Sequence, residues 1–204
     1  IFDLKNITAM YGTSVGSMST TILSMKFDWD VYADYLIKRP WQKIWNIDVS
    51  KVIGAYENCG IYSRDFMSKF IEPFLFARDL SIDVTMLEFY NHTGVELHIY
   101  VTELNEFECK DISYKTYPEW KLIDAVYASC CLPVIFSPYT TEEGKCYIDG
   151  SFFVNYPIDY CIKNIGKTNQ HRILGIHLMM ASPEKKHQKI NNTNMFNYLM
   201  ELMN

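Results

Sequence analysis

The residues Gly12-Thr13-Ser14-Val15-Gly16 place a serine between two glycines, an arrangement that suits a nucleophilic hydroxyl. A serine hydroxyl is a weak nucleophile at neutral pH, so it needs a base within hydrogen-bond distance and a turn that projects Oγ away from the backbone. The G-x-S-x-G pattern meets the second need, because such a turn presses the residues two before and two after the serine against their neighbours. We therefore expect a side chain at either Gly12 or Gly16 to clash.

A helix starting directly after Ser14 would supply a second part of an acyl-transfer site. The backbone N–H of Val15 would then point at a developing oxyanion, helped by the positive end of the helix dipole. The alternative interpretation is an ordinary strand-to-helix turn that happens to contain a serine, because glycine and serine are common and the five-residue pattern is weak on its own.

The base is the next question, and Asp149 is the strongest candidate. It follows the apolar run at 145–148 and precedes Gly150, at a strand end where α/β folds place active-site groups. A buried carboxylate with a raised pKa can act as general base without an imidazole. The alternative is a turn-forming Asp-Gly pair.

None of the five histidines has a neighbourhood that marks it as catalytic, and a hydrogen-bonded surface or core role is the expectation for each. They are His92, His98, His171, His177 and His187.

The elements that would position these residues alternate between strand and helix. We expect strands at 7–11, 96–104, 145–148 and 172–180, with a hairpin partner for the second at 107–114, and helices at 15–25, 28–37, 64–76, 86–92 and 120–131. Thr85 and Glu88 have the spacing of a capping box, Gly94 is the expected helix end, Ser63 is a candidate cap, and Pro73 should disturb the end of its helix. This order favours an α/β fold with a mostly parallel sheet.

Size and composition limit the function. The chain has 204 residues, 49% of them hydrophobic, with a formal net charge of -5, so we expect one domain and no nucleic-acid partner. The six cysteines show no metal-binding spacing, which favours reduced thiols. No apolar run approaches the roughly 20 residues of a membrane span. We expect an intracellular protein, cytoplasmic with peripheral membrane association.

We expect both ends of the given sequence to lie inside a longer protein. The chain opens without Met in "IFDLKNITAMYG" and closes in "TNMFNYLMELMN". We expect an N-terminally incomplete hydrolase domain over 1–180, an exposed loop or linker over 181–194, and the start of a C-terminal helix over 195–204.

Four ordered blocks resemble the patatin-like phospholipase family: Gly12 to Gly16, "ELHIYVTEL" at 96–104, "LIDAVYASCCLPVIFSPY" at 122–139 and "YIDGSFFVNYP" at 147–157. The resemblance implies a three-layer α/β/α sandwich and a Ser-Asp dyad that cleaves acyl esters, without cofactor, metal or catalytic histidine. Carried over by position, the nucleophile is Ser14 and the general base is Asp149, followed by Gly150. The family's A-S-x-x-x-P block matches 128–133, which we interpret as support around the pocket.

Two departures from the family pattern bear on activity. Ser151 stands where the family usually has Gly or Ala, a change that would alter the local turn. The glycine-rich oxyanion loop of the family is not found, and we expect it on a strand that precedes Ile1. Val15 N–H is then the one oxyanion donor that can be named, and loss of one donor typically costs on the order of 100-fold to 1,000-fold in rate.

The function predicted is a lipid acyl hydrolase that acts through an acyl-enzyme intermediate on a lipid or small acyl ester, with a membrane surface as a transient partner. One alternative is an α/β-hydrolase whose triad takes Ser14, Asp149 and one of His171, His177 or His187. Another is a catalytically inactive member that binds lipid or a partner protein.

Overall fold

The computed structural model describes residues 3–44, 55 and 58–177. The chain divides into two compact units, 1–157 and 158–204, which are described separately below. The linker predicted at 181–194 and the helix predicted at 195–204 lie outside the described residues. Within the described part, no helix is long and apolar enough to cross a bilayer.

Strands and helices alternate along the first unit, in the order expected for an α/β fold. The strands are β1 (Ala9–Thr13), β2 (Gly60–Tyr62), β3 (Glu96–Glu103), β4 (Glu108–Ile112), β5 (Val134–Phe136), β6 (Tyr139–Thr140) and β7 (Cys146–Asp149). The α-helices are α1 (Val15–Ser24), α2 (Trp29–Lys38), α4 (Arg64–Phe76), α5 (Met86–Thr93) and α6 (Leu122–Ser129), with short 3-10 helices η1 (Leu4–Asn6), η2 (Trp41–Lys43) and η3 (Gly150–Phe152). The α/β fold class is confirmed.

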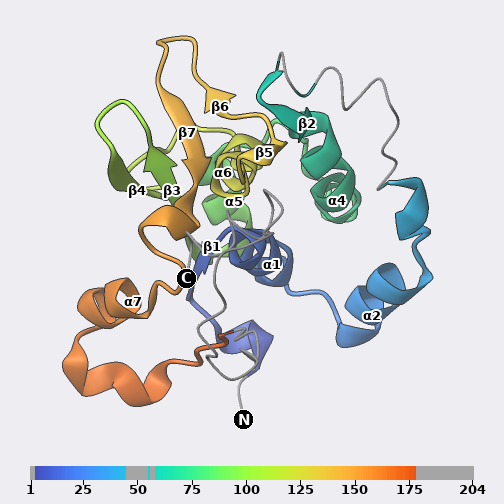
Figure 1. Ribbon diagram of the computed structural model, residues 1–204. Helices are drawn as coiled ribbons and strands as arrows, with labels where there is room; N and C mark the ends of the chain where they lie inside the picture. Colours follow the sequence, from blue (N-terminus) through green and yellow to red (C-terminus); the bar gives the residue numbers. More distant parts are fainter. Residues whose placement is uncertain (1–2, 45–54, 56–57, 178–204) are drawn as a thin grey trace, which may run out of the picture. The chain divides into compact units, whose positions relative to one another are not determined.

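Strand β3 organises the main sheet, and three strands pair with it. β1 is parallel to it, whereas β4 and β7 are antiparallel, and β6 continues the sheet from β7 (Figure 1). The hairpin predicted for 96–104 and 107–114 is thus present as β3 and β4. A separate parallel pair, β2 and β5, was not predicted, because three-residue strands carry too little alternation to be recognised.

The registers show that β1 and β7 meet end to end along β3. The last residue of β1, Thr13, pairs with Tyr100, and the last residue of β7, Asp149, pairs with the next residue, Val101. Because β1 runs parallel and β7 antiparallel to β3, their carboxyl ends face each other. This junction is what brings two distant parts of the sequence together.

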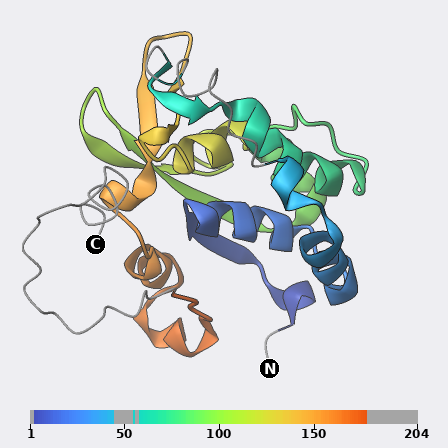
Figure 2. The same ribbon diagram turned by 45° about the vertical axis from the view of Figure 1, so that its right-hand side comes forward.

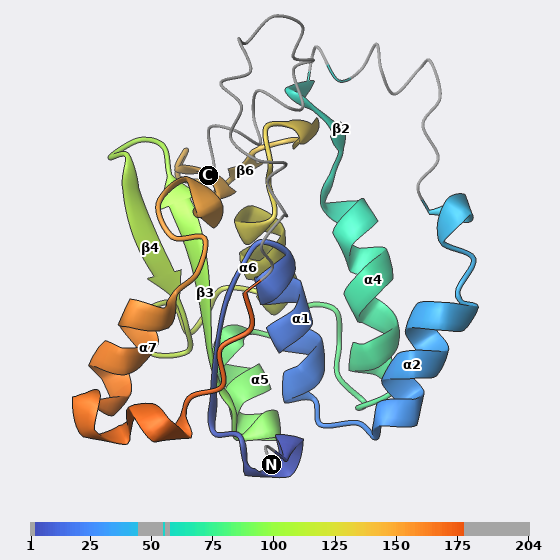
Figure 3. The ribbon, with the colours of Figure 1, turned by 60° about the horizontal axis from the view of Figure 1, so that its bottom comes forward.

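Helices bury the apolar side of the sheet. α1 lies over β1 and β3 (Figure 2), and α4 lies beside α1 and α6 (Figure 3). α6 is enclosed between β3, β7 and α4, and every residue of it except Asp124 is buried. A helix that is apolar on nearly all sides belongs in such an interior position.

Local signals in the sequence predicted two helices well. α5 has the full capping box, since Thr85 Oγ1 accepts from the Glu88 N–H and the Glu88 carboxylate accepts from the Thr85 N–H, and it ends at Gly94 with φ 65°. α4 starts after Ser63, although the Ser63 side chain makes no capping bond. Both ends of α5 depend on neighbouring residues alone, which is why the sequence predicted them.

Helix α4 continues past Pro73 to Phe76, because the carbonyl that proline leaves without its helical donor is taken by other groups. That carbonyl belongs to Lys69, and it accepts from the Arg39 guanidinium and, at 3.4 Å, from Tyr35 Oη. The α2 region therefore compensates for the missing proline N–H.

The second unit contains α7 (Ile158–Ile165) and η4 (Lys167–Arg172). The strand predicted at 172–180 is wrong over 172–177, where η4 ends and no strand follows, and the remainder lies outside the described residues. An apolar run needs a partner strand to become a strand, and none of the described residues pairs with this one; Leu174 and Ile176 are exposed.

Candidate active site

Ser14 lies at the sharp turn between β1 and α1, with φ 55° and ψ -127°. A non-glycine residue rarely adopts this conformation, which costs on the order of 1–3 kcal/mol and persists only where the surroundings enforce it. The turn separates the Ser14 side chain from the helix that follows. The strand-to-helix turn expected from the G-x-S-x-G pattern is thus present, and it holds Ser14 in a strained conformation.

The Ser14 hydroxyl donates a hydrogen bond directly to Asp149, with 2.6 Å between Oγ and Oδ2. The two residues are 135 positions apart, and they meet because β1 and β7 end against adjacent residues of β3. A carboxylate at this distance can take the hydroxyl proton as Oγ attacks an electrophile.

Asp149 is almost completely enclosed, with 1% of its surface exposed. Burial raises the pKa of its carboxyl group, while hydrogen bonds from Ser14 and Ser151 act in the opposite direction. Its hydrogen-bond partners are neutral: the Ser14 hydroxyl on Oδ2 and, at 2.9 Å, the Ser151 backbone N–H on Oδ1. A raised pKa lets this carboxylate hold a proton transiently, as a general base must.

The backbone of Asp149 is fixed as firmly as its side chain. Its N–H donates to the Cys131 carbonyl at 3.0 Å, and its carbonyl accepts from Thr102 Oγ1 at 2.9 Å. Ser151, which departs from the family pattern, still supplies its N–H to the carboxylate, because that donor belongs to the backbone. The departure leaves this contact intact.

The three motif glycines differ in how tightly they are packed. A Cβ on Gly12 would lie 2.5 Å from the Gly16 carbonyl oxygen, and one on Gly150 would lie 2.2 Å from the Tyr100 carbonyl oxygen. A Cβ on Gly16 would meet nothing within 4 Å, so the expected clash at Gly16 is wrong. The Cα of Gly16 faces the open side of the turn. The backbone carbonyl of Gly16, and not a side chain at that position, is what packs against Gly12.

Two buried serines hold the backbone of Ser14. The Ser14 N–H donates to Ser129 Oγ at 2.9 Å, and the Ser129 hydroxyl donates to the Tyr100 carbonyl at 2.7 Å. On the other side, the Ser17 hydroxyl donates to the Ser14 carbonyl at 2.7 Å. The block at 128–133 was expected only to support the pocket, and Ser17 was not predicted, because no local pattern shows which side chain reaches the strand end.

Val15 is the first residue of α1, so its N–H has no acceptor within the helix. Its side chain is exposed, which places this end of the helix at the surface beside Ser14. This N–H lies at the positive end of the helix dipole, and it stays the candidate oxyanion donor.

Among the described residues of the first unit, no histidine hydrogen-bonds to Ser14. His98 is buried between two carboxylates, with Nδ1 2.8 Å from Asp111 Oδ2 and Nε2 2.9 Å from Glu96 Oε1, and it stacks on Tyr11. His92 is at the end of α5. His171 and His177 are in the second unit, and His187 lies outside the described residues.

Two cysteines pack near Asp149 without competing for its role. Burial, and to a lesser extent the negative charge of Asp149, raises the pKa of Cys130 well above its usual range. Burial also raises the pKa of Cys131. Both thiols stay protonated at neutral pH and are therefore poor nucleophiles. All six cysteines are free, as their spacing predicted.

The carboxylates of Glu103, Glu106 and Glu108 come within 4.8 Å of one another, and such a group is a potential metal site. Lys110 Nζ lies within ion-pair distance of all three. Lys145 Nζ also lies 3.5 Å from Glu103 Oε1, so two cations already pair with these carboxylates, and we interpret the group as an ion-pair network.

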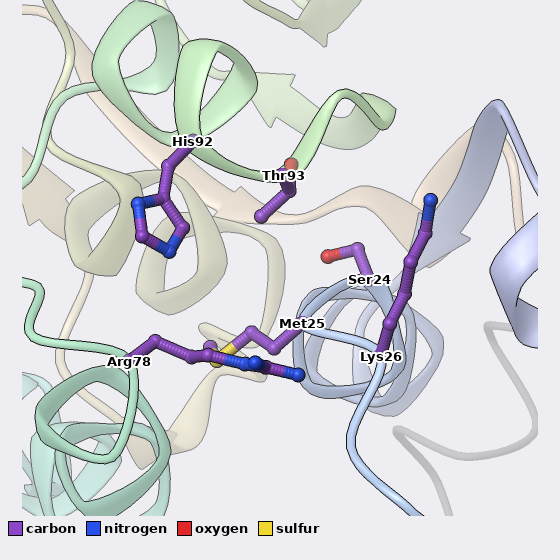
Figure 4. Close-up of a pocket in the computed structure, with 6 residues that line it drawn as sticks. All are labelled: Ser24, Met25, Lys26, Arg78, His92 and Thr93. Atoms are coloured by element: carbon purple, nitrogen blue, oxygen red, sulfur yellow. The ribbon is translucent and has the colours of Figure 1, made fainter.

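A pocket of about 200 Å³ lies at the other end of α1, away from Ser14. Figure 4 shows its lining of Ser24, Met25, Lys26, Arg78, His92 and Thr93. Three helices, α1, α4 and α5, end at or next to these residues. Cationic side chains stabilise the partial negative charge of helix C-termini, which explains the basic lining without a ligand.

Most of the chain matches the model of one protein family. Residues 2–162 match the family described as patatin-like phospholipase. A probable lipid hydrolase of invertebrate iridescent virus 6 is 25% identical over 83% of this chain and 58% of its own length. An uncharacterised protein of Acanthamoeba polyphaga mimivirus is 26% identical over 81% of this chain and 54% of its own length. The chain thus spans little more than half of these viral relatives.

Among solved structures, VipD from Legionella pneumophila superposes with a TM-score of 0.48 at 16% identity. The superposition covers 72% of this chain and 40% of VipD.

Proposed function

Because the chain belongs to the patatin-like phospholipase family, we propose that it hydrolyses acyl esters of lipids through a dyad of Ser14 and Asp149. The observation that carries the proposal is the direct hydrogen bond from Ser14 Oγ to Asp149 Oδ2. A viral relative described as a probable lipid hydrolase supports the same reaction class.

In the first step, Asp149 accepts the Ser14 proton while Oγ attacks the ester carbonyl. The tetrahedral intermediate collapses as Asp149 returns the proton to the departing alcohol oxygen, which leaves an acyl-enzyme on Ser14. Asp149 then takes a proton from water as the water oxygen attacks the acyl group, and it returns that proton to Ser14 Oγ when the second tetrahedral intermediate collapses and releases the fatty acid. The raised pKa of Asp149 favours its transient protonation in both steps.

The negative oxygen of each tetrahedral intermediate needs a donor. Val15 N–H, at the first position of α1, supplies one and uses the positive end of the helix dipole. The reaction needs no metal or cofactor in this mechanism, because the proton moves between Ser14, Asp149 and the oxygens of substrate or water.

The triad alternative requires an imidazole between the serine and the carboxylate. In the first unit, the 2.6 Å contact between Ser14 Oγ and Asp149 Oδ2 leaves no room for one. An inactive lipid-binding protein is disfavoured by the strain at Ser14, because a strained serine beside a buried carboxylate is costly and serves chemistry rather than binding.

For a substrate, we propose lipid esters presented at a membrane surface, which the protein visits transiently from the cytoplasm. Val15, next to the nucleophile, has 58% of its surface exposed, which suits contact with an acyl chain. Assays should therefore offer esters in vesicles as well as in solution.

A fluorophosphonate probe tests the dyad, because it forms a covalent bond with an activated serine. We expect intact-mass labelling of the wild type, none in Ser14→Ala, a sharp decrease in Asp149→Asn, and unchanged labelling in each His→Ala variant. Ser63→Ala is the matched control, since Ser63 occupies a second strand-to-helix turn.

Two results would contradict the proposal. Dependence of labelling on one of the histidines would favour the triad. A folded wild type that binds vesicles and never labels would favour an inactive lipid-binding protein.

A further inference from the structure

The strained backbone of Ser14 needs to be held in place. With φ 55° and ψ -127°, the turn would relax toward a common conformation unless its peptide groups were fixed, and relaxation would swing Oγ away from Asp149. Both polar groups of the Ser14 backbone have side-chain partners from buried serines.

Ser129 holds the N–H side. Its hydroxyl has a single proton, which is used in the 2.7 Å bond to the Tyr100 carbonyl, so a lone pair is left to accept from the Ser14 N–H at 2.9 Å. The direction of both hydrogen bonds is thereby fixed: Ser14 N–H donates to Ser129 Oγ, and the Ser129 hydroxyl donates to the Tyr100 carbonyl. Tyr100 pairs with the last residue of β1, which ties Ser129 at the end of α6 to the strand carrying the nucleophile.

Ser17 holds the carbonyl side. Its hydroxyl donates to the Ser14 carbonyl at 2.7 Å, and its backbone N–H donates to the same oxygen at 2.8 Å. Ser17 and Ser129 both have 0% of their surface exposed. Water therefore cannot replace either hydroxyl without a rearrangement of the core.

We infer that Ser129 and Ser17 are positioning residues that clamp the backbone of Ser14 and aim its hydroxyl at Asp149. The inference rests on the proposed function, since it concerns how the nucleophile is held. Neither hydroxyl contacts Asp149 in the structure; each acts through the Ser14 peptide groups. Displacing a reacting group by about 1 Å can cost about 100-fold in rate.

Helix α1 offers a matched control at its other end. Ser24 is also buried, and its hydroxyl donates to the Thr21 carbonyl at 2.7 Å, the same three-residue spacing as Ser17 to Ser14. Ser24→Ala therefore removes an equivalent hydrogen bond from the same helix without touching the nucleophile. Any loss of activity common to both variants is structural.

The experiment compares Ser17→Ala, Ser129→Ala and Ser24→Ala in the full-length protein, by kcat, KM, Tm and the rate of fluorophosphonate labelling. We expect Ser17→Ala and Ser129→Ala each to lower kcat and the labelling rate roughly 10-fold to 100-fold with little change in KM. Ser24→Ala should lower Tm by a similar amount and leave kcat within about twofold of the wild type.

A conservative variant and a mapping step separate the outcomes. Ser129→Thr keeps the hydroxyl and should recover part of the kcat lost in Ser129→Ala. Alanine favours helix, so Ser17→Ala should fold even if Ser129→Ala does not. The inference is overturned if Ser17→Ala and Ser24→Ala lose kcat equally. Peptide mapping that finds the probe elsewhere than on Ser14, or no labelling of the wild type, would instead overturn the proposed function.

Discussion

The first unit contains two strand-to-helix turns with a serine at the junction, and they differ in almost every respect. Ser14 stands between β1 and α1 with φ 55°, whereas Ser63 stands between β2 and α4 with φ -111° and ψ -177°. Neither side chain caps its helix. Ser63 is exposed in extended backbone, and the Ser14 hydroxyl is bound to a buried carboxylate.

The comparison shows what separates the proposed nucleophile from an ordinary serine in a turn. In both turns the serine carbonyl accepts a hydrogen bond from the backbone N–H three residues later: Ser17 N–H donates to Ser14 O, and Phe66 N–H donates to Ser63 O. The two helices therefore begin in the same way. The two turns differ in backbone strain. The strained turn at Ser14 is supported by Ser129, Ser17 and the close packing at Gly12, whereas the relaxed backbone at Ser63 needs no such support. Strain that is held by several neighbours is typical of functional turns and supports the role proposed for Ser14.

The largest difference is expected when each serine loses its hydroxyl. Ser14→Ala should lower kcat/KM for an acyl ester by roughly 10⁴-fold to 10⁶-fold, because the acyl-enzyme cannot form. Ser63→Ala should stay within about twofold. Ester hydrolysis by purified variants measures both, and equal losses would mean that the strained turn has no special role.

The next effect concerns the carboxylate that only Ser14 has beside it. Asp149→Asn should lower kcat by roughly 10³-fold or more, since the amide cannot accept the proton. Because burial raises the pKa of Asp149 in the folded state, ionisation of this group opposes folding. The variant should therefore be more stable than the wild type above the folded pKa, with the difference vanishing below the unfolded pKa of about 3.8. Urea unfolding at several pH values tests this; a less stable variant at neutral pH would contradict it.

The pH dependence of the reaction follows from the same pKa. Asp149 must be ionised to act as base, so kcat/KM should fall about tenfold per pH unit as pH decreases through its raised pKa. We expect this acid limb to lie above the ordinary aspartate range. An acid limb that disappears when a histidine is replaced would assign it to that imidazole instead.

The glycines flanking Ser14 should respond unequally. Gly12→Ala forces a Cβ to within 2.5 Å of the Gly16 carbonyl and should destabilise the protein by about 2–4 kcal/mol. Gly16→Ala places a Cβ in open space within a helix and should be neutral or stabilising by up to about 1 kcal/mol. Denaturant unfolding measures the stability of both variants. Equal destabilisation would mean that both glycines are tightly packed, as the motif predicted.

The smallest effect is the release of strain itself. Ser14→Gly and Ser14→Ala both remove the hydroxyl from Asp149, but only glycine permits φ 55° without a Cβ penalty, so we expect Ser14→Gly to be more stable than Ser14→Ala by about 1 kcal/mol. At position 63 the backbone is relaxed, so Ser63→Gly should be less stable than Ser63→Ala. Thermal unfolding of the four variants measures both differences, and equal stability of Ser14→Gly and Ser14→Ala would mean that the backbone of Ser14 is not strained.

The sequence predicted features that depend on neighbouring residues and on the four blocks of resemblance. The capping box of α5, the helix at 64–76 and the pairing of Ser14 with Asp149 belong to this class. The clamp by Ser129 and Ser17 could not be predicted, because it depends on where α6 ends relative to β3. The strand predicted at 172–177 and the clash at Gly16 were wrong for a related reason: an apolar run does not reveal its partner, and a motif does not reveal which side of a turn is open.

The end-to-end meeting of β1 and β7 on β3 has a kinetic consequence. The dyad forms only after residues 135 positions apart have both added to the same strand, and such long-range pairings form late because the intervening chain must first be closed into a loop. Reactivity of Ser14 toward a covalent probe should therefore appear after most of the helical signal during refolding. Labelling of Ser14 would thus report the last stage in the assembly of this sheet.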